Sequence, residues 1–132
     1  SSLSGAGQQV GADWLNAGIR TGAMPIPASV AERLEGRRFG SFDAYRRAFW
    51  KAVAQEPELM GQFDRRSQEA IKKGFAPSTP KSVRVGKRDR WELDHINPLW
   101  NNGELYGADN LQIMPPKSHI EKTREDMKGY RS

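Results

Sequence analysis

The amino-acid sequence predicts an α+β fold, in which a helical N-terminal body is followed by a strand, a long loop, a second strand and a helix. Two observations predict it. Apolar residues recur at three- and four-residue intervals before residue 74, as they do in amphipathic helices. After residue 87, polar and apolar residues alternate instead, which is typical of a strand. The 132 residues suffice for a buried core, so we expect a single domain over residues 1–132.

The helical body is expected to contain four helices. The strongest pattern begins at Ser41, an N-cap residue type, and continues as a stripe of side chains at helical spacing. We expect this stripe to pack in the core, and its members are Phe42, Tyr45, Phe49, Ala52 and Val53. Pro57 interrupts the pattern, and Gly74 ends a later, more polar helix. The expected helices span residues 8–20, 29–34, 41 onwards and 64–73.

The C-terminal part is expected to form two strands and a helix. Alternation over residues 88–95 places four charged residues on one face of the first strand. A loop rich in turn residues follows, and a second strand covers residues 111–114 until two consecutive prolines end it. A polar helix then runs over about residues 117–128.

Charge and composition limit the classes of binding partner and the kinds of reactive group that the chain can have. The chain has 21 Lys and Arg against 16 Asp and Glu, a net charge of +5 that suits nucleic acid, an anionic membrane or an acidic protein. It has no cysteine, which excludes disulfides, thiol nucleophiles and thiolate metal sites. No apolar run approaches about 18 residues, so we expect no stable membrane insertion. Residues 1–7, rich in Ser and Gly, are interpreted as a linker remnant of a longer protein.

Both histidines lie in the predicted strand–loop–strand–helix stretch. His95 follows Asp94 directly, Asn110 comes fifteen residues after His95, and His119 comes nine residues after Asn110. These intervals resemble the HNH, or ββα-metal, nuclease motif over residues 88–131. The resemblance implies a C-terminal ββα-metal finger, which brings the end of a strand and a helix together around one divalent ion.

Phosphodiester hydrolysis explains why these residue types are needed. A water must lose a proton as it attacks phosphorus, and a neutral imidazole accepts protons near neutral pH. A divalent cation neutralises the charge that builds on the phosphate oxygens and on the leaving alkoxide. His95 is therefore the expected general base, and Asp94 and His119 are the expected metal ligands. A carboxylate with one imidazole favours Mg²⁺ or Mn²⁺, with Ni²⁺ or Zn²⁺ as the alternatives.

A wider resemblance covers nearly the whole chain. Five segments resemble the DNase domains of DNase-type colicins and S-type pyocins: residues 22–27, 41–50, 57–59, 73–77 and 79–81. The resemblance implies the cytotoxic DNA endonuclease domain of a bacteriocin. Such a protein is secreted by its producer as part of a larger bacteriocin and acts in the cytoplasm of the target bacterium. The resemblance also implies an acidic immunity protein that binds and blocks the domain.

The same resemblance implies roles for further residues. Arg88 is expected to contact the phosphate or to stabilise the transition state, and Glu92 to orient Arg88 or a histidine. Arg46 is expected to be structural or to contact phosphate, and Lys117 is a further candidate for phosphate binding. Asn110 either hydrogen-bonds across the loop that carries the base or ligates the metal.

Three positions depart from the family's pattern. Asp94 and Thr123 stand where the family carries histidines, so water is expected to fill more of the metal's coordination shell. Positions 119 and 123 lie one helical turn apart and share a face. Ser78 stands where colicins carry an aromatic anchor for the immunity protein, so a cognate inhibitor is expected to use other contacts. One such surface is the basic helix that carries Arg65, Arg66, Lys72 and Lys73.

Two other functions stay open as alternatives. A catalytically weak nucleic-acid-binding or protein-binding module would keep the fold with an impaired metal site, and Thr123 is its support. An HNH endonuclease from a restriction, phage or contact-dependent toxin system would share the motif, but the bacteriocin-like helical body argues against it.

Overall fold

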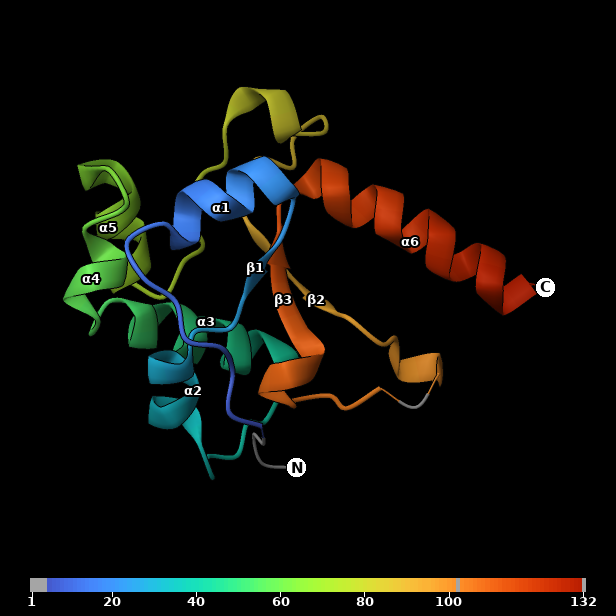
Figure 1. Ribbon diagram of the computed structural model, residues 1–132, viewed down its shortest axis with the longest axis horizontal. Helices are drawn as coiled ribbons and strands as arrows, with labels where there is room; N and C mark the ends of the chain where they lie inside the picture. The colour runs from blue at the N-terminus through green and yellow to red at the C-terminus, as the bar shows by residue number, and fades with distance from the viewer. Residues whose placement is uncertain (1–4, 102, 132) are drawn as a thin grey trace.

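A three-stranded antiparallel sheet joins the two halves of the chain (Figure 1). The structure is a computed structural model that describes residues 5–101 and 103–131. Ile113, in the central strand, lies opposite Met24 on one side and Leu93 on the other. The sheet therefore takes one strand from the N-terminal half and two from the C-terminal half. The strands are β1 (Met24–Pro25), β2 (Glu92–His95) and β3 (Leu111–Met114), in the order β1-β3-β2.

The described residues form six α-helices, five of which precede β2. The last helix extends away from the rest of the molecule to the C-terminus (Figure 1). Its first turn follows β3 directly and lies beside β2. The helices are α1 (Trp14–Thr21), α2 (Ala28–Leu34), α3 (Phe42–Val53), α4 (Pro57–Met60), α5 (Arg65–Lys72) and α6 (Pro116–Arg131).

Helix α3 begins where the sequence predicts. The Oγ atom of Ser41 accepts a hydrogen bond from the backbone N–H of Ala44 at 3.1 Å, which satisfies one of the unpaired donors at the helix start. Tyr45, Phe49 and Val53 are completely buried, so the prediction that the aromatic stripe packs in the core is confirmed.

The core lies between the sheet and the helices. Close packing of α1 on β1 depends on Gly18, because a Cβ atom there would lie 2.0 Å from Cγ of Met24. Any larger residue would have to displace the buried Met24 side chain. The core thereby fixes β1 beside β3, and with it the position of the central strand.

Residues 8–13 do not form the helix that the sequence predicts. The backbone N–H of Gln8 donates to the Ile26 carbonyl at 2.9 Å, and the N–H of Ala28 donates to the Gln8 carbonyl at 2.7 Å. This pairing holds Gln8 in an isolated bridge with Pro27, residues 12 and 13 form a turn, and α1 begins only at Trp14. Strand β1 is absent from the sequence prediction because a strand of two residues is too short to show alternation.

The first predicted strand is shorter than expected. Alternation begins at residue 88, but β2 begins at Glu92, because the residues before it pair with the connector that follows α5. The N–H of Thr79 donates to the Asp89 carbonyl at 2.8 Å, and the N–H of Trp91 donates to the Pro77 carbonyl at 3.1 Å. Strand β3 has the predicted bounds.

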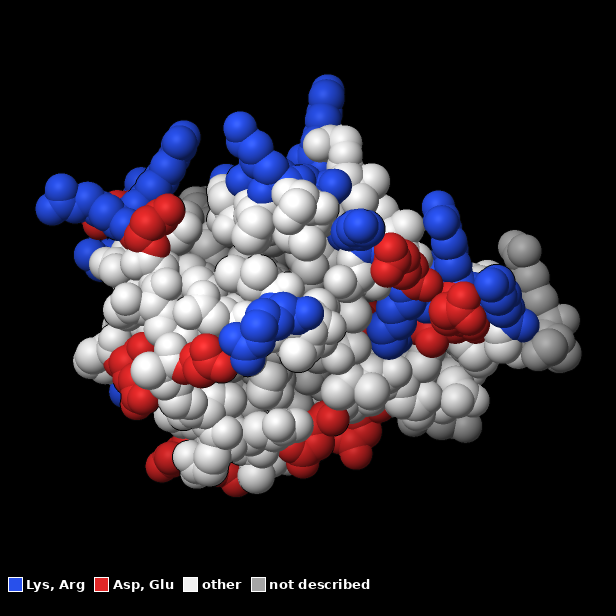
Figure 2. All heavy atoms as spheres, turned by 45° about the horizontal axis from the view of Figure 1, so that its top comes forward, with Lys and Arg blue, Asp and Glu red and all other residues white. Residues whose placement is uncertain are grey.

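The surface carries its charges unevenly. Figure 2 shows Lys and Arg gathered along the upper edge of one face and Asp and Glu along the lower edge, with both signs mixed over α6 at the right. None of the described helices is both long enough and apolar enough to cross a membrane. The expected linker lies partly outside the described residues, and the N–H of Gly7 donates to Oδ1 of Asp109 at 3.0 Å.

Candidate active site

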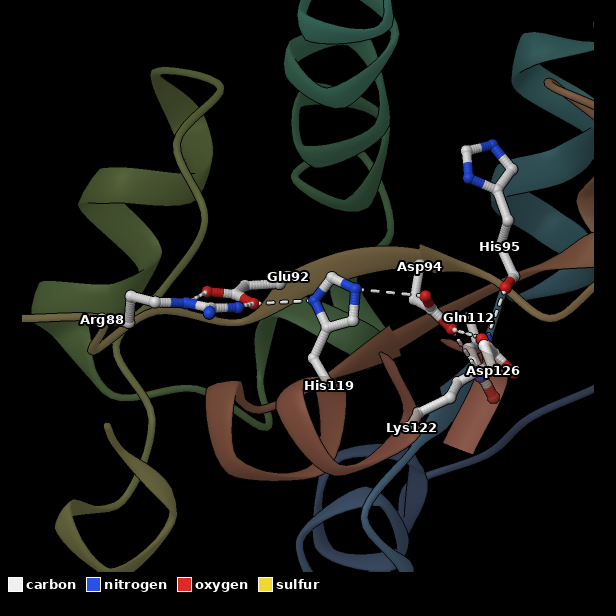
Figure 3. A network of polar contacts seen from close by, with 8 residues as sticks. All are labelled: Arg88, Glu92, Asp94, His95, Gln112, His119, Lys122 and Asp126. Atoms are coloured by element: carbon white, nitrogen blue, oxygen red, sulfur yellow. Dashed lines mark hydrogen bonds and ion pairs between the residues drawn. The ribbon is translucent and has the colours of Figure 1, made fainter. Parts of the chain in front are cut away.

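Strand β2 and helix α6 bring the two expected metal ligands together (Figure 3). The Oδ1 atom of Asp94, on β2, lies 3.1 Å from Nε2 of His119, in the first turn of α6. Gln112, on the neighbouring strand β3, donates from Nε2 to Oδ2 of Asp94 at 2.9 Å. The Asp94 carboxylate is thus held in place from the sheet and presents one oxygen to the histidine.

Glu92 holds the other side of the His119 ring. Its Oε1 atom lies 2.8 Å from Nδ1 of His119, and its carboxylate also accepts two hydrogen bonds from Arg88, one of them from Nε at 2.9 Å. Residues 92 and 94 are two apart in a strand and therefore face the same side. The structure thus brings Arg88, Glu92, Asp94 and His119 into one polar row (Figure 3).

These contacts shift the pKa values of the three titrating groups. Hydrogen bonding to Asp94, and then to Glu92, raises the pKa of His119 although burial opposes it. Burial raises the pKa of Glu92 and Asp94, but hydrogen bonds from Arg88 and His119 to Glu92, and from His119 and Gln112 to Asp94, outweigh it, so both pKa values are lowered. Both carboxylates are therefore ionised at neutral pH and attract a cation.

The expected general base, His95, points away from this row (Figure 3). Its Nε2 atom lies 2.9 Å from the carbonyl oxygen of Leu105, and its ring packs against the Phe42 ring of α3 at 5.0 Å between centroids. A carbonyl only accepts hydrogen bonds, so Nε2 carries the proton. The neutral ring then has its acceptor at Nδ1, which is the atom that can take a proton from water.

Both polar atoms of the Asn110 side chain form hydrogen bonds with the backbone of the loop between β2 and β3. Its Oδ1 atom accepts from the N–H of Asn97 at 2.7 Å, and its Nδ2 atom donates to the carbonyls of Asn97 at 3.1 Å and Glu104 at 2.9 Å. The loop therefore returns from His95 in a defined path, and Leu105 is placed beside the His95 ring.

An open cleft of about 730 Å³ adjoins the polar row. Glu92 and His119 form part of its wall, so the cleft reaches one of the two expected metal ligands. Arg46 lies in it, whereas Lys117, exposed at the start of α6, is not among the residues that line it. The basic residues of its wall are Arg46, Arg47, Lys51, Lys73 and Arg90.

Asp94 and His119 can act as two ligands of one divalent ion. Their facing atoms are 3.1 Å apart, so both would reach the same ion. Among the described residues, no group of three or more His, Cys, Asp or Glu side chains could hold a metal. Thr123 is exposed on α6. The pair therefore fits an ion whose remaining ligands are water or substrate oxygens.

Sequence reasoning missed two residues that complete the surroundings of Asp94. Gln112, which lies opposite Asp94 in the sheet, is not among the predicted site residues. Lys122 donates from Nζ to the His95 carbonyl at 2.9 Å and lies 3.3 Å from Oδ2 of Asp94. Its spacing was available as a signal, because Lys122 lies three residues after His119 and therefore close to the same helix face.

Two antiparallel strands and a following helix, with Asp-His on the first strand and His on the helix, define a nuclease unit of the ββα-metal, or HNH, class. Comparison with known families agrees. The family described as "Colicin/Pyocin-S2, DNase domain" matches residues 1–124. The chain belongs to this DNase-domain family of colicins and pyocins.

Individual relatives show the extent of the similarity. The chain is 38% identical over 118 residues to Colicin-E7 of Escherichia coli, covering 89% of this chain and 20% of the colicin. It is 36% identical over 120 residues to Pyocin-S2 of Pseudomonas aeruginosa, covering 91% of this chain and 17% of the pyocin. The chain thus spans about a fifth of the length of these two relatives.

Solved structures share the fold closely. The crystal structure of the pyocin AP41 DNase–immunity complex matches with a TM-score of 0.88 at 34% identity, covering 95% of this chain and 98% of that one. The mutant nuclease domain of pyocin S8 with its cognate immunity protein matches with a TM-score of 0.86 at 36% identity, covering 92% and 97%.

Proposed function

We propose that this chain is the cytotoxic domain of a bacteriocin and hydrolyses phosphodiester bonds in the DNA of the target cell. The observation that carries the proposal is the Asp94–His119 pair, held at 3.1 Å by two elements, with His119 in the wall of a basic cleft. The cleft supplies cations for the DNA backbone, and the pair supplies a place for a divalent ion. Membership of the DNase-domain family supports the same activity.

Each site residue has a separate role in the proposed reaction. Nδ1 of His95 removes the proton from the attacking water, because its Nε2 is committed to Leu105. Asp94 and His119 would hold a divalent ion, which would neutralise the charge that develops on the phosphate and the leaving oxygen. Glu92 orients His119.

Four further residues bind the DNA or position the expected base. Arg88, ion-paired with Glu92 at one end of the row, would contact the phosphate and stabilise its added charge. Arg46 binds the backbone of the DNA within the cleft, and Lys117 contacts the phosphate backbone from outside it. Asn110 keeps the loop that supports His95 in place.

The donor set favours Mg²⁺ or Mn²⁺ over Ni²⁺ or Zn²⁺. A buried carboxylate and a single imidazole form a harder ligand set than several imidazoles would. Ions that keep several waters suit a site with two protein ligands. DNase domains of colicins are metal-dependent in general, which supports a requirement for an ion here.

An acidic immunity protein is the second proposed partner. Both solved relatives are complexes of a DNase domain with an immunity protein. The exposed basic residues Arg65 and Arg66 on α5 form a surface that an acidic protein fits. By the same analogy, the chain is secreted within a larger bacteriocin and acts in the cytoplasm of the target bacterium.

Plasmid nicking tests the proposed activity. The chain is incubated with supercoiled DNA in Mg²⁺, Mn²⁺, Ni²⁺ or Zn²⁺, beside the variants His95→Ala and Asp94→Ala. We expect cutting by the parent, a loss of about 100-fold or more for His95→Ala, and a joint loss of metal binding and cutting for Asp94→Ala. Undiminished cutting by His95→Ala would show that His95 is not the general base. If the parent cuts in none of these metals, the result would favour the alternative of a catalytically weak module that binds nucleic acid or protein.

A further inference from the structure

The ammonium group of Lys122 lies inside the candidate site. The side chain is 19% exposed, and it reaches across from α6 to the end of β2 (Figure 3). Its Nζ atom contacts three oxygens: the His95 carbonyl at 2.9 Å, Oδ2 of Asp94 at 3.3 Å and Oδ2 of Asp126, one helical turn further on. It donates hydrogen bonds to the His95 carbonyl and to Asp126, and it forms an ion pair with Asp94.

This contact fixes which oxygen of Asp94 is available. Oδ2 faces Lys122 and accepts from Gln112, whereas Oδ1 faces His119. A carboxylate held in this way offers one oxygen to an ion and cannot rotate to offer both. Lys122 therefore restricts how Asp94 ligates.

Lys122 also connects the two functional residues of β2. It holds the backbone carbonyl of His95 and the side chain of the preceding Asp94 from a single atom. His95, the expected base, and Asp94, the expected ligand, are thereby both held to α6, which also carries His119. Asp126 balances the charge of the ammonium.

We propose that Lys122 is a positioning residue of the nuclease, and that its fixed positive charge weakens the site's hold on the divalent ion. The inference rests on the proposed role of Asp94 and His119 as ligands. Like charges a few ångströms apart repel measurably even when water screens them. Removing Lys122 therefore has two opposite effects: metal binds more tightly, and DNA is cut more slowly.

Calorimetric titration of Mn²⁺ into the complete chain measures the first effect, and plasmid nicking at saturating Mn²⁺ measures the second. Lys122→Met is expected to bind Mn²⁺ about tenfold more tightly than the parent and to cut at a rate reduced about tenfold or more. Lys128→Met, on the exposed part of the same helix, removes an equal charge and is the control. Lys122→Arg keeps the charge, so its Mn²⁺ affinity is expected to stay at that of the parent.

A second variant tests the charge balance with the opposite sign. Asp126→Asn removes one of the two carboxylates that balance Lys122 and is expected to weaken Mn²⁺ binding, compared with the matched exposed variant Glu125→Gln. This variant decides the question if circular dichroism shows that Lys122→Met does not fold.

The outcomes separate this inference from the proposed function. Suppose that the parent binds Mn²⁺ while Lys122→Met has the same affinity as Lys128→Met or cuts at the parent rate. Either result overturns the role of Lys122 and leaves the proposed nuclease function standing. If Asp126→Asn matches Glu125→Gln, the charge argument is overturned. A parent that binds no Mn²⁺ overturns both the metal site and the inference built on it.

Discussion

The Nδ1 atom of His119 lies 2.8 Å from Oε1 of Glu92, and Nε2 of the same ring lies 3.1 Å from Oδ1 of Asp94. The ring is held between two carboxylates that alternate along one face of β2 (Figure 3). A hydrogen bond from Nδ1–H to Glu92 directs Nε2 towards Asp94 and increases the basicity of the ring. Glu92 therefore orients the ring of His119 without itself being one of the expected ligands.

Replacing Glu92 with glutamine is expected to weaken metal binding. The substitution keeps the size of the side chain but removes the charge that holds Nδ1–H of His119 and the Arg88 guanidinium. Changes of this kind around a metal ligand typically cost about 10- to 100-fold in affinity. Titration of Mn²⁺ measures the change, with Glu121→Gln on the exposed side of α6 as the control. Equal affinities for the two variants would show that Glu92 does not orient His119.

The metal-free protein is expected to lose stability as pH rises above neutrality. The pKa of His119 is raised from 6.5 by its hydrogen bonds to Asp94 and Glu92, so the folded state favours the protonated ring. This contribution to the free energy of unfolding is complete below the unfolded pKa and disappears as pH rises through the higher folded pKa.

Urea unfolding in a chelator, at about pH 6 and about pH 9, measures this loss. His119→Gln lacks the titrating ring, so its stability is expected to fall less over the same interval. The same pH dependence in both proteins would contradict the proposed origin of the effect.

Introducing a histidine at position 123 is expected to strengthen binding of Ni²⁺ or Zn²⁺. Thr123 is exposed and lies one helical turn after His119, so an imidazole there shares its face of α6. Thr123→His therefore adds a ligand type that these ions prefer. Calorimetry compares it with Glu121→His, which places the same group elsewhere on the helix. Unchanged affinity for Thr123→His would show that position 123 does not face the ion.

DNA binding is expected to depend steeply on salt. If the cleft neutralises about four phosphates, log K falls against log salt with a slope of roughly −3.6. Fluorescence anisotropy of a duplex in a chelator, using His95→Ala to prevent cutting, measures the slope. Arg90→Ala removes one cation of the cleft and is expected to reduce the slope by about 0.9, while Lys128→Ala leaves it unchanged. A flat salt response would argue against binding through phosphates.

Much of the fold was predictable because its signals are local. Ser41 caps α3 through a hydrogen bond to a residue three positions away, and the two prolines after β3 end it regardless of context. The spacing of His95, Asn110 and His119 likewise identified the candidate site. Strand β1 and the start of β2 were not predictable, because their backbone partners lie in distant segments.

The sequence by itself determined the class of protein, the identity of the expected base and ligands, and the two departures at Asp94 and Thr123. Only the tertiary structure decided which atoms of these residues are available. Contact of Nε2 of His95 with Leu105, and of Lys122 with Oδ2 of Asp94, follows from the path of the loop and the docking of α6 against β2. Such contacts join residues 10 and more positions apart, where periodicity carries no information and packing alone sets the distance.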